Sequence, residues 1–424
     1  MQSRNSNLIL WFIAITLLFP LFVQISGGIY NNPIPVHDSG GLLDKLPLPI
    51  SIGACVFGIL ALGKNYRQAT PAILFILAFG AAMLLSLFFA GESPDVERRK
   101  VVLAAQILLP TMGLVLGQLV RDEQNVIPRA FMWVLLLMVP FQLCAGWWQQ
   151  TRTLTHYLYA FSIYQHFQFV PVIFVLAFCI VMVHLWDQHK VLLRPLAAVM
   201  AIYVIASASL LAIGLYSGFV ALFFLQRTWR LKTTRWIGFL MFGAGMLAVV
   251  ILMSLYYSFA KDYSFNNNNI SDFGGNNQYI GKFKKLAEGK MPVNVEERLA
   301  DWTMFLKGTT ENYRTLMFGH VEPLPREVRT SAHNWYLDFA YNFGLIALLP
   351  VVALIVFTMY LVWRFRRSLP GETWWLAGLL AFMVFVDSNL KVTLRQPYPG
   401  IIVYFLWGLL LSRLRFQAGL RLVN

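Results

Sequence analysis

"LILWFIAITLLFPLFVQ", residues 8–24, is an apolar run long enough to cross the hydrocarbon core of a membrane as a helix. No small-x-small cleavage site follows it, so we interpret it as a retained first helix and not as a signal peptide. Similar runs recur along the chain. Hydrophobic residues make up 58% of the sequence and charged residues only 13%, unlike a soluble globular protein. The sequence therefore predicts an all-α polytopic membrane protein.

The apolar runs define most of the expected spans directly. They lie near 8–25, 47–63, 71–90, 101–120, 130–148, 170–186, 236–256, 343–363, 372–390 and 399–413. The stretch 195–226 is too long for one span, and each half is shorter than usual. Its flanking segments, "WDQHKVLLR" and "QRTWRLKTTR", are both basic and should therefore lie on one side of the membrane. That requires two crossings, so we expect about twelve transmembrane helices.

The net charge of +14 has a topological explanation, because Lys and Arg are retained in cytoplasmic loops. It does not indicate a nucleic-acid partner. With a cytoplasmic N-terminus, seventeen Lys and Arg fall in cytoplasmic segments, seven in short outer loops and ten in the long segment 257–340. We therefore expect a multi-pass protein with both termini cytoplasmic, divided into transmembrane residues 1–256, an exported loop at 257–342 and transmembrane residues 343–424.

The exported loop contains one clear helical pattern, "PVNVEERLADWTMFLKG". Asn294 is a suitable N-cap, Glu297 stands three residues later as in a capping box, and Gly308 follows the expected end. Arg298 lies on this helix. Its planar, permanently charged guanidinium suits a phosphate or diphosphate group, although a solvated Arg paired with Asp301 or Glu297 is the simpler interpretation.

"TSAHNWYLDFAYNFG", residues 330–344, places polar residues just before an apolar run. If 332–344 is helical, His333 shares a face with Leu337, while Asn334 and Asp338 lie four apart on a neighbouring face. A histidine can accept a proton from a hydroxyl at neutral pH. It can equally mark the membrane interface, where aromatic residues gather. The residues alone leave both interpretations open.

Other cationic residues on the expected outer face could form a rim around a membrane cavity, as a lipid-linked diphosphate would require. Asp387 is an intramembrane acid near the same face, and such residues are functional candidates; pairing with Lys391 would also explain it. No motif suggests a metal site or a cofactor, so we expect metal-free chemistry. The candidates for this rim are Arg98, Arg99, Lys100, Arg152, Lys391 and Arg395, and Arg314 in the long loop could separately face an anionic substrate.

The order of these motifs resembles the bacterial O-antigen ligases and the related O-antigen polymerases. That family carries His, then Asn, Ser or Gln, nine residues, and Gly-x-x-Gly; here His333, Asn334 and Gly344 match, and Ala347 replaces the last glycine. The family's earlier helix with Arg and Trp, followed by a glycine motif, is represented by "ERLADWTMFLKGTTENYRTLMFGH". Its Arg, Trp and first Gly correspond to Arg298, Trp302 and Gly319.

The resemblance implies inverting, metal-independent transfer of a glycan from undecaprenyl diphosphate to lipid A–core oligosaccharide. The enzyme would lie in the bacterial inner membrane, with its active site facing the periplasm. His333 would be the general base and Arg298 would bind the diphosphate. Substrate-binding candidates are Asn334, Trp302, Tyr336, Arg314, Arg98, Arg99, Lys391 and Arg395.

Three other functions remain open at this point. An O-antigen polymerase or a protein O-oligosaccharyltransferase would use the same donor with another acceptor. A lipid or sugar transporter accounts for twelve spans equally well, but it does not account for the exported segment with Arg298 and His333. The sequence also lacks the clear internal repeat that transporter folds often carry.

Overall fold

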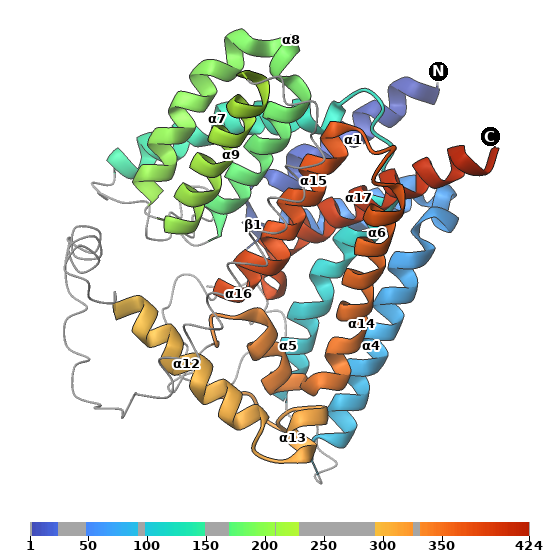
Figure 1. Cartoon of the computed structure of the whole chain (residues 1–424), viewed down its shortest axis with the longest axis vertical. Helices are drawn as coiled ribbons and strands as arrows, with labels where there is room; N and C mark the ends of the chain where they lie inside the picture. The colour runs from blue at the N-terminus through green and yellow to red at the C-terminus, as the bar shows by residue number, and fades with distance from the viewer. Residues whose placement is uncertain are drawn as a thin grey trace.

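The computed structural model describes residues 2–23, 48–91, 98–148, 169–207, 209–228, 293–324 and 331–423. These residues are mostly helical (Figure 1). The strands within them are the two-residue segments β1 (Phe22–Val23) and β2 (Leu48–Pro49), which pair antiparallel. The predicted helical membrane class is confirmed at this level.

In the described ranges, eight helices are long and apolar enough to cross a membrane, and Asn7–Leu18 and Ile50–Leu62 are shorter apolar helices. The total of twelve spans stays a prediction, because the expected span at 236–256 lies outside the described residues.

The first half of the chain supplies a series of apolar helices. Pro110 lies in a short 3-10 turn that interrupts the expected span at 101–120, as expected for a residue without a backbone N–H. The elements are α1 (Gln2–Leu18), α3 (Ile50–Leu62), η1 (Gly63–Ala69), α4 (Thr70–Phe89), α5 (Arg98–Leu108), η2 (Leu109–Thr111), α6 (Met112–Leu119), α7 (Val126–Trp148), α8 (Val170–Ser207) and α9 (Leu210–Thr228).

The second half joins two helices of the long segment 257–340 to long apolar helices. Its elements are α12 (Val293–Thr309), α13 (Tyr313–Phe318), α14 (Trp335–Phe365), α15 (Gly371–Ala381), the π-helical turn η4 (Phe382–Asp387), α16 (Ser388–Leu390), η5 (Thr393–Arg395) and α17 (Pro397–Val423).

The stretch 195–226 is indeed divided into two helices. α8 kinks at His189, whose φ of −129° and ψ of 35° are not helical, and α9 begins at Leu210 after a break in the helix. The ion pair between Arg227 Nη2 and Asp187 Oδ2, at 2.8 Å, brings the end of α9 next to the kink of α8. The two basic segments therefore meet at one end of the molecule, as two crossings require.

Figure 1 shows both chain termini at the upper end of the molecule and α12 and α13 at the lower end. Two side-chain contacts between distant segments agree with this arrangement. Asn7 Nδ2 donates to Gln124 Oε1 at 2.8 Å, and Arg415 Nη1 donates to the Gln68 carbonyl at 2.8 Å. These residues all belong to segments predicted to be cytoplasmic. These segments therefore lie at the same end of the molecule, whereas the side of the membrane that this end faces stays a prediction.

Close backbone contact between α6 and α17 forms much of the centre. A Cβ added at Gly117 would lie 2.1 Å from the Phe405 carbonyl oxygen, and one added at Gly408 would lie 2.2 Å from that of Leu114. Small residues at such crossings let membrane helices approach closely.

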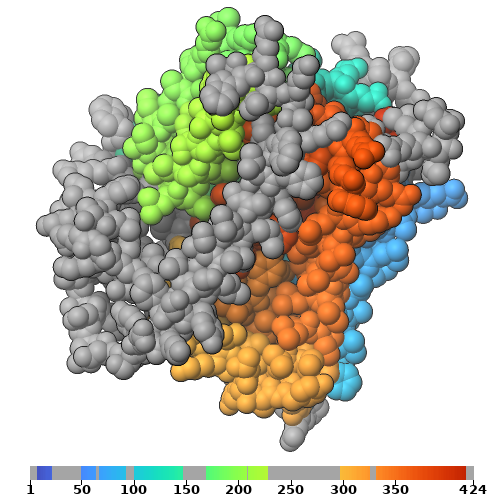
Figure 2. All heavy atoms as spheres, viewed as in Figure 1, coloured from blue at the N-terminus to red at the C-terminus, as the bar shows by residue number. Residues whose placement is uncertain are grey.

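At the opposite end, side chains of α12 and α13 cover the lower surface beside α14 (Figure 2). This segment carries the candidate site.

Candidate active site

α12 supplies the first side of the site. The helix begins at Val293, so Asn294 lies inside it and the predicted N-cap is wrong. The helix also includes Gly308 and ends one residue later, at Thr309. Trp302 and Phe305 are buried at 5% and 2% exposure. Their burial fixes the face of α12 that packs against the protein.

Two glycines fix the position of α13 against α14. Gly319 has φ +76° and Gly344 has φ +75°, a region that favours glycine. A Cβ at Gly344 would lie 2.2 Å from the Met317 carbonyl oxygen, and one at Gly319 would lie 2.5 Å from the Asn342 carbonyl. Gly319 therefore forms the turn that ends α13. Gly344 also kinks α14, close to the predicted start of the last transmembrane region at residue 343.

His320 completes this junction and has a structural environment. Its ring stacks on Tyr341 with centroids 4.0 Å apart, and its Nε2 lies 3.0 Å from the Gly308 carbonyl oxygen. The buried Lys100 donates to the His320 carbonyl at 2.6 Å. Lys100, an expected member of the cationic rim, therefore joins α5 to this turn.

His333 lies just before α14, so the condition that residues 332–344 are all helical is not met at their start. Helix α14 begins at Trp335, and Asn334 is its N-cap: the Asn334 side chain accepts from the N–H groups of Tyr336 at 3.0 Å and Leu337 at 3.2 Å. His333 has φ +50°, which is uncommon for a residue other than glycine. His333 and Leu337 therefore do not share a helix face. Backbone conformation, instead of helical periodicity, directs the His333 side chain.

Asp301 on α12 is the partner of His333. His333 Nδ1 lies 3.2 Å from Asp301 Oδ2, while the carboxylate side chain is 2% exposed and the histidine side chain 34% exposed. A carboxylate that accepts from one imidazole nitrogen fixes the ring orientation and favours a proton at that position. The other ring nitrogen is then the one able to accept a proton. This pair has the geometry of an oriented general base.

Two further contacts connect the start of α14 to the segment after α15. Arg395 Nη1 donates to Asp338 Oδ2 at 2.9 Å, and Asp338 Oδ1 accepts from the Ala332 N–H at 3.4 Å. Asn334 Nδ2 donates to Asn389 Oδ1 at 3.2 Å. Asp338 therefore supports the local chain, and its main partner is Arg395.

Asp387 is the centre of a buried charged cluster at the end of η4. Its Oδ1 lies 3.7 Å from Lys391 Nζ, with side-chain exposures of 1% and 5%. The Thr393 hydroxyl donates to its Oδ2. The charge of Asp387 also acts on Arg298 of α12. A short π-helical turn thus places one carboxylate where it pairs with Lys391 and its charge acts on Arg298, and such turns are frequent at functional sites.

Burial changes the acid–base properties of both cations. Removal from water lowers the pKa of the Arg298 guanidinium below its ordinary value, and the charges of Asp387 and Asp301 raise it in part. Burial likewise lowers the pKa of the Lys391 ammonium to about 8, although Asp387 acts in the opposite direction. Desolvated cations attract an anionic group more strongly than cations in water.

The remaining predicted site residues lie in other environments. Arg314 Nε donates to the Phe89 carbonyl at 2.9 Å and so attaches α13 to the end of α4; no contact brings it to His333 in the described part of the chain. Trp302 is buried on α12, and the Tyr336 hydroxyl donates to the Val384 carbonyl at 2.9 Å. Both have packing roles here.

Two predicted positions lie partly or wholly outside the described residues. Arg98 and Arg99 begin α5, but their side chains are outside the described part, and Arg152 is entirely outside it. Their participation in a cationic rim stays a prediction.

Sequence reasoning missed Asp301, Asn389 and Thr393 as site residues. Asp301 was visible only as an ion-pair partner for Arg298, three residues earlier on the helix. Its contact with His333 spans 32 positions of sequence and depends on the docking of α12 against the start of α14. Thr393 follows Asp387 by six residues, so a polar cluster around the intramembrane acid was the available signal.

Comparison with models of protein families and with curated proteins finds no match for this sequence. Within the described ranges, no group of three or more His, Cys, Asp or Glu side chains is arranged to hold a metal ion. Metal-free chemistry stays a prediction from the sequence. The function is therefore argued from the site itself.

Proposed function

We propose that the chain is a glycosyltransferase of the O-antigen ligase type. Its donor is a glycan on undecaprenyl diphosphate, and its acceptor is a hydroxyl of lipid A–core oligosaccharide. The observation that carries the proposal is one convergence of groups: the His333–Asp301 pair, Arg298 and the Lys391–Asp387 pair meet where α12, the start of α14 and the segment after η4 come together. A base near two cations, one of them buried, suits attack by a hydroxyl with departure of a diphosphate.

His333 acts as the general base in this proposal. Its free ring nitrogen accepts the proton of the acceptor hydroxyl while the acceptor oxygen forms a bond to the anomeric carbon of the donor sugar. Asp301 stabilises the imidazolium that results and keeps the ring in position. The exposed third of the His333 side chain provides access for the acceptor.

The bond between the anomeric carbon and the diphosphate oxygen breaks in the same step, and its electron pair leaves with the diphosphate. Arg298 and Lys391 stabilise the negative charge that develops there, an effect that is often the largest single contribution to such a transfer. A guanidinium can bind two phosphate oxygens at once, whereas the ammonium acts as a point charge. A single displacement inverts the configuration at the anomeric carbon.

The remaining expectations complete the proposal. The site faces the periplasm of a bacterial inner membrane, both termini are cytoplasmic, and about twelve helices cross the bilayer. The reaction uses neither a metal ion nor another cofactor. A reporter fused within residues 264–280 should give a periplasmic signal, and a cytoplasmic signal would contradict this topology.

The test supplies purified enzyme with undecaprenyl-diphosphate-linked glycan and separates the products by acceptor. Extension of lipid A–core, lost in His333→Ala and Arg298→Ala but kept in the surface variant Arg364→Ala, supports the ligase. Extension of another lipid-linked glycan indicates a polymerase, and extension of a protein indicates an oligosaccharyltransferase. Full transfer by both site variants at normal expression would exclude the assigned roles. Activity that chelator removes and Mg²⁺ restores would exclude the metal-free mechanism.

A further inference from the structure

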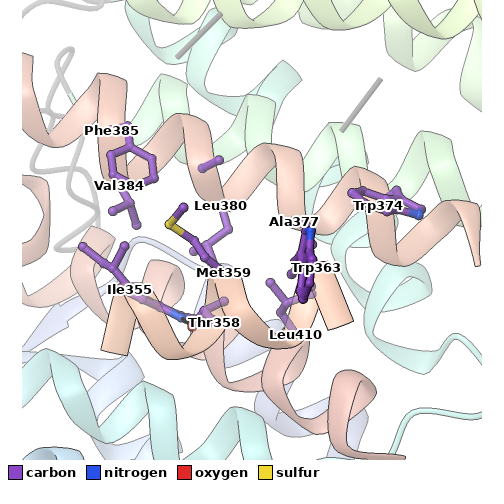
Figure 3. A pocket seen from close by; sticks show the side chains of 13 residues that line it. Ile355, Thr358, Met359, Trp363, Trp374, Ala377, Leu380, Val384, Phe385 and Leu410 are labelled. Atoms are coloured by element: carbon purple, nitrogen blue, oxygen red, sulfur yellow. Dashed lines mark hydrogen bonds between the residues drawn. The ribbon is translucent and has the colours of Figure 1, made fainter. Parts of the chain in front are cut away.

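An apolar groove lies between the second half of α14, the α15–η4 segment and α17. Its cavity has a volume of about 190 Å³. Figure 3 shows Val384 and Phe385 at one end and Trp374 toward the other, with Met359 and Leu380 between them. The residues that line it are almost all apolar, so the groove is suited to a hydrocarbon chain.

The one hydroxyl in the lining is already engaged. Thr358 Oγ1 donates to the Leu354 carbonyl at 2.8 Å and accepts from Trp407 Nε1 at 2.7 Å. A sugar or a head group placed here would lose hydrogen bonds to water without replacing them, at a substantial cost. A polar ligand is therefore disfavoured.

The groove opens toward the outside of the helical bundle. Met359 and Trp363, which contribute to its lining, are 43% and 59% exposed. Both lie on α14, a helix apolar enough to cross a membrane. A chain in the bilayer can therefore enter from the side, without passing through a polar region.

The inner end of the groove is connected to the candidate active site. The Val384 carbonyl accepts from the Tyr336 hydroxyl at 2.9 Å, and the Phe385 carbonyl accepts from Asn389 Nδ2 at 2.8 Å. Asn389 in turn accepts from Asn334, the residue after His333. Asp387 follows Phe385 by two residues. The end of the groove is thus less than one helical turn from Asp387, which pairs with the buried Lys391.

We propose that this groove holds the prenyl chain of the lipid-linked donor and thereby places its diphosphate beside Lys391 and Arg298. The inference rests on the proposed function, since it assumes a donor with a diphosphate head and a long apolar tail. The polar head and the tail then occupy adjacent regions of one site. The groove becomes the part of the enzyme that selects a prenyl lipid over other anchors.

The first experiment tests binding without requiring glycan transfer. The full chain in nanodiscs is irradiated with an undecaprenyl diphosphate that carries a diazirine on its chain, and labelled peptides are mapped by mass spectrometry. We expect labels within α14 and the α15–η4 segment, removed by excess undecaprenyl phosphate but not by phosphatidylglycerol. Labels confined to other helices, or equal competition by phosphatidylglycerol, would overturn the proposal.

The second experiment fills the groove. Ala377→Trp places a large ring in the lining, whereas Ala353→Trp makes the same change on an exposed face of α14. We expect Ala377→Trp to raise KM for the lipid-linked donor on the order of tenfold with kcat little changed, and Ala353→Trp to leave KM unaltered. An unchanged donor KM in a folded Ala377→Trp protein would refute the assignment.

The two proposals fail in different ways. If the groove is labelled specifically but the wild-type enzyme extends no acceptor, prenyl binding is supported and the transferase function is excluded. If transfer depends on His333 but the labels lie in other helices, the transferase function is supported and prenyl binding in the groove is excluded.

Discussion

Asp301→Asn is the most direct test of the site, because it removes one charge and leaves the shape of the side chain almost unchanged. In the structure the Asp301 carboxylate lies 3.2 Å from His333 Nδ1 and is buried. Asparagine can still accept a hydrogen bond through its oxygen, but it cannot stabilise an imidazolium by charge. We expect a lower kcat, with KM for the donor little changed, because the pair acts when the proton moves.

The size of the effect follows from the kind of contact. A hydrogen bond to a charged group contributes roughly 1.5–3 kcal/mol, which corresponds to roughly 10- to 150-fold in rate. The His333 side chain is one-third exposed, so solvent screening favours the lower part of that range, about 10- to 50-fold. His333→Ala removes the base itself and should cost roughly 10²–10⁴-fold.

A double-variant cycle separates this role from a general loss of structure. If Asp301 acts through His333, then His333→Ala with Asp301→Asn should be no slower than His333→Ala alone. Glu297→Gln is the matched control, because it removes a neighbouring carboxylate of α12 whose charge also acts on Arg298. Asp301 does not act through His333 if Asp301→Asn keeps the wild-type kcat, or if it costs the same factor in the His333→Ala background.

Three further predictions concern the cations and the junction of α13 with α14. Arg298→Lys keeps a charge but loses the planar pair of donors, so transfer should fall on the order of tenfold with unchanged expression; wild-type transfer would exclude bidentate binding. Lys391 is charged below its pKa of about 8, so the rate of transfer should decline as pH rises through that value. In the pH–rate profile of Lys391→Arg this decline should be absent. Gly344→Ala should lower the melting temperature, with a loss of about 2 kcal/mol or more. Gly80→Ala, where an added Cβ meets nothing within 4 Å, is the control, and equal melting temperatures would contradict the clash at Gly344.

The hydropathy pattern was sufficient to predict the helical membrane class and several boundaries. Apolar length alone predicted spans that correspond to α4, α7 and α17. The basic residues around 195–226 predicted two crossings, and the Asp187–Arg227 ion pair agrees with that prediction. Such predictions succeed because a bilayer requires each crossing segment to satisfy its own backbone hydrogen bonds. Sequence could not anticipate that Pro110 and Gly344 would interrupt helices without ending the apolar segment.

The sequence predicted which residue types form the candidate site, but not which side chains contact one another. Arg298 and His333 could be proposed as a cation and a base, since their chemistry is local. Their arrangement depends on a positive φ at His333 and on Asp301 reaching it from another helix. Both features come from tertiary packing, which no helical periodicity records. Arg314 was proposed from its charge alone. In the structure its Nε donates to the Phe89 carbonyl, so it attaches α13 to the end of α4.

The order of groups along the site gives the proposed reaction a direction. The apolar groove ends near Asp387, which pairs with the buried Lys391; the charges of Asp387 and Asp301 both act on Arg298, and Asp301 pairs with His333. A lipid-linked donor that followed this order would extend from tail to diphosphate to sugar, with its anomeric carbon toward the base. In this proposal the acceptor hydroxyl reaches the exposed part of His333 and arrives opposite the leaving group. That is the in-line arrangement required for inversion in one step, so retention of configuration in the product would disprove this order even if every residue named here proved essential.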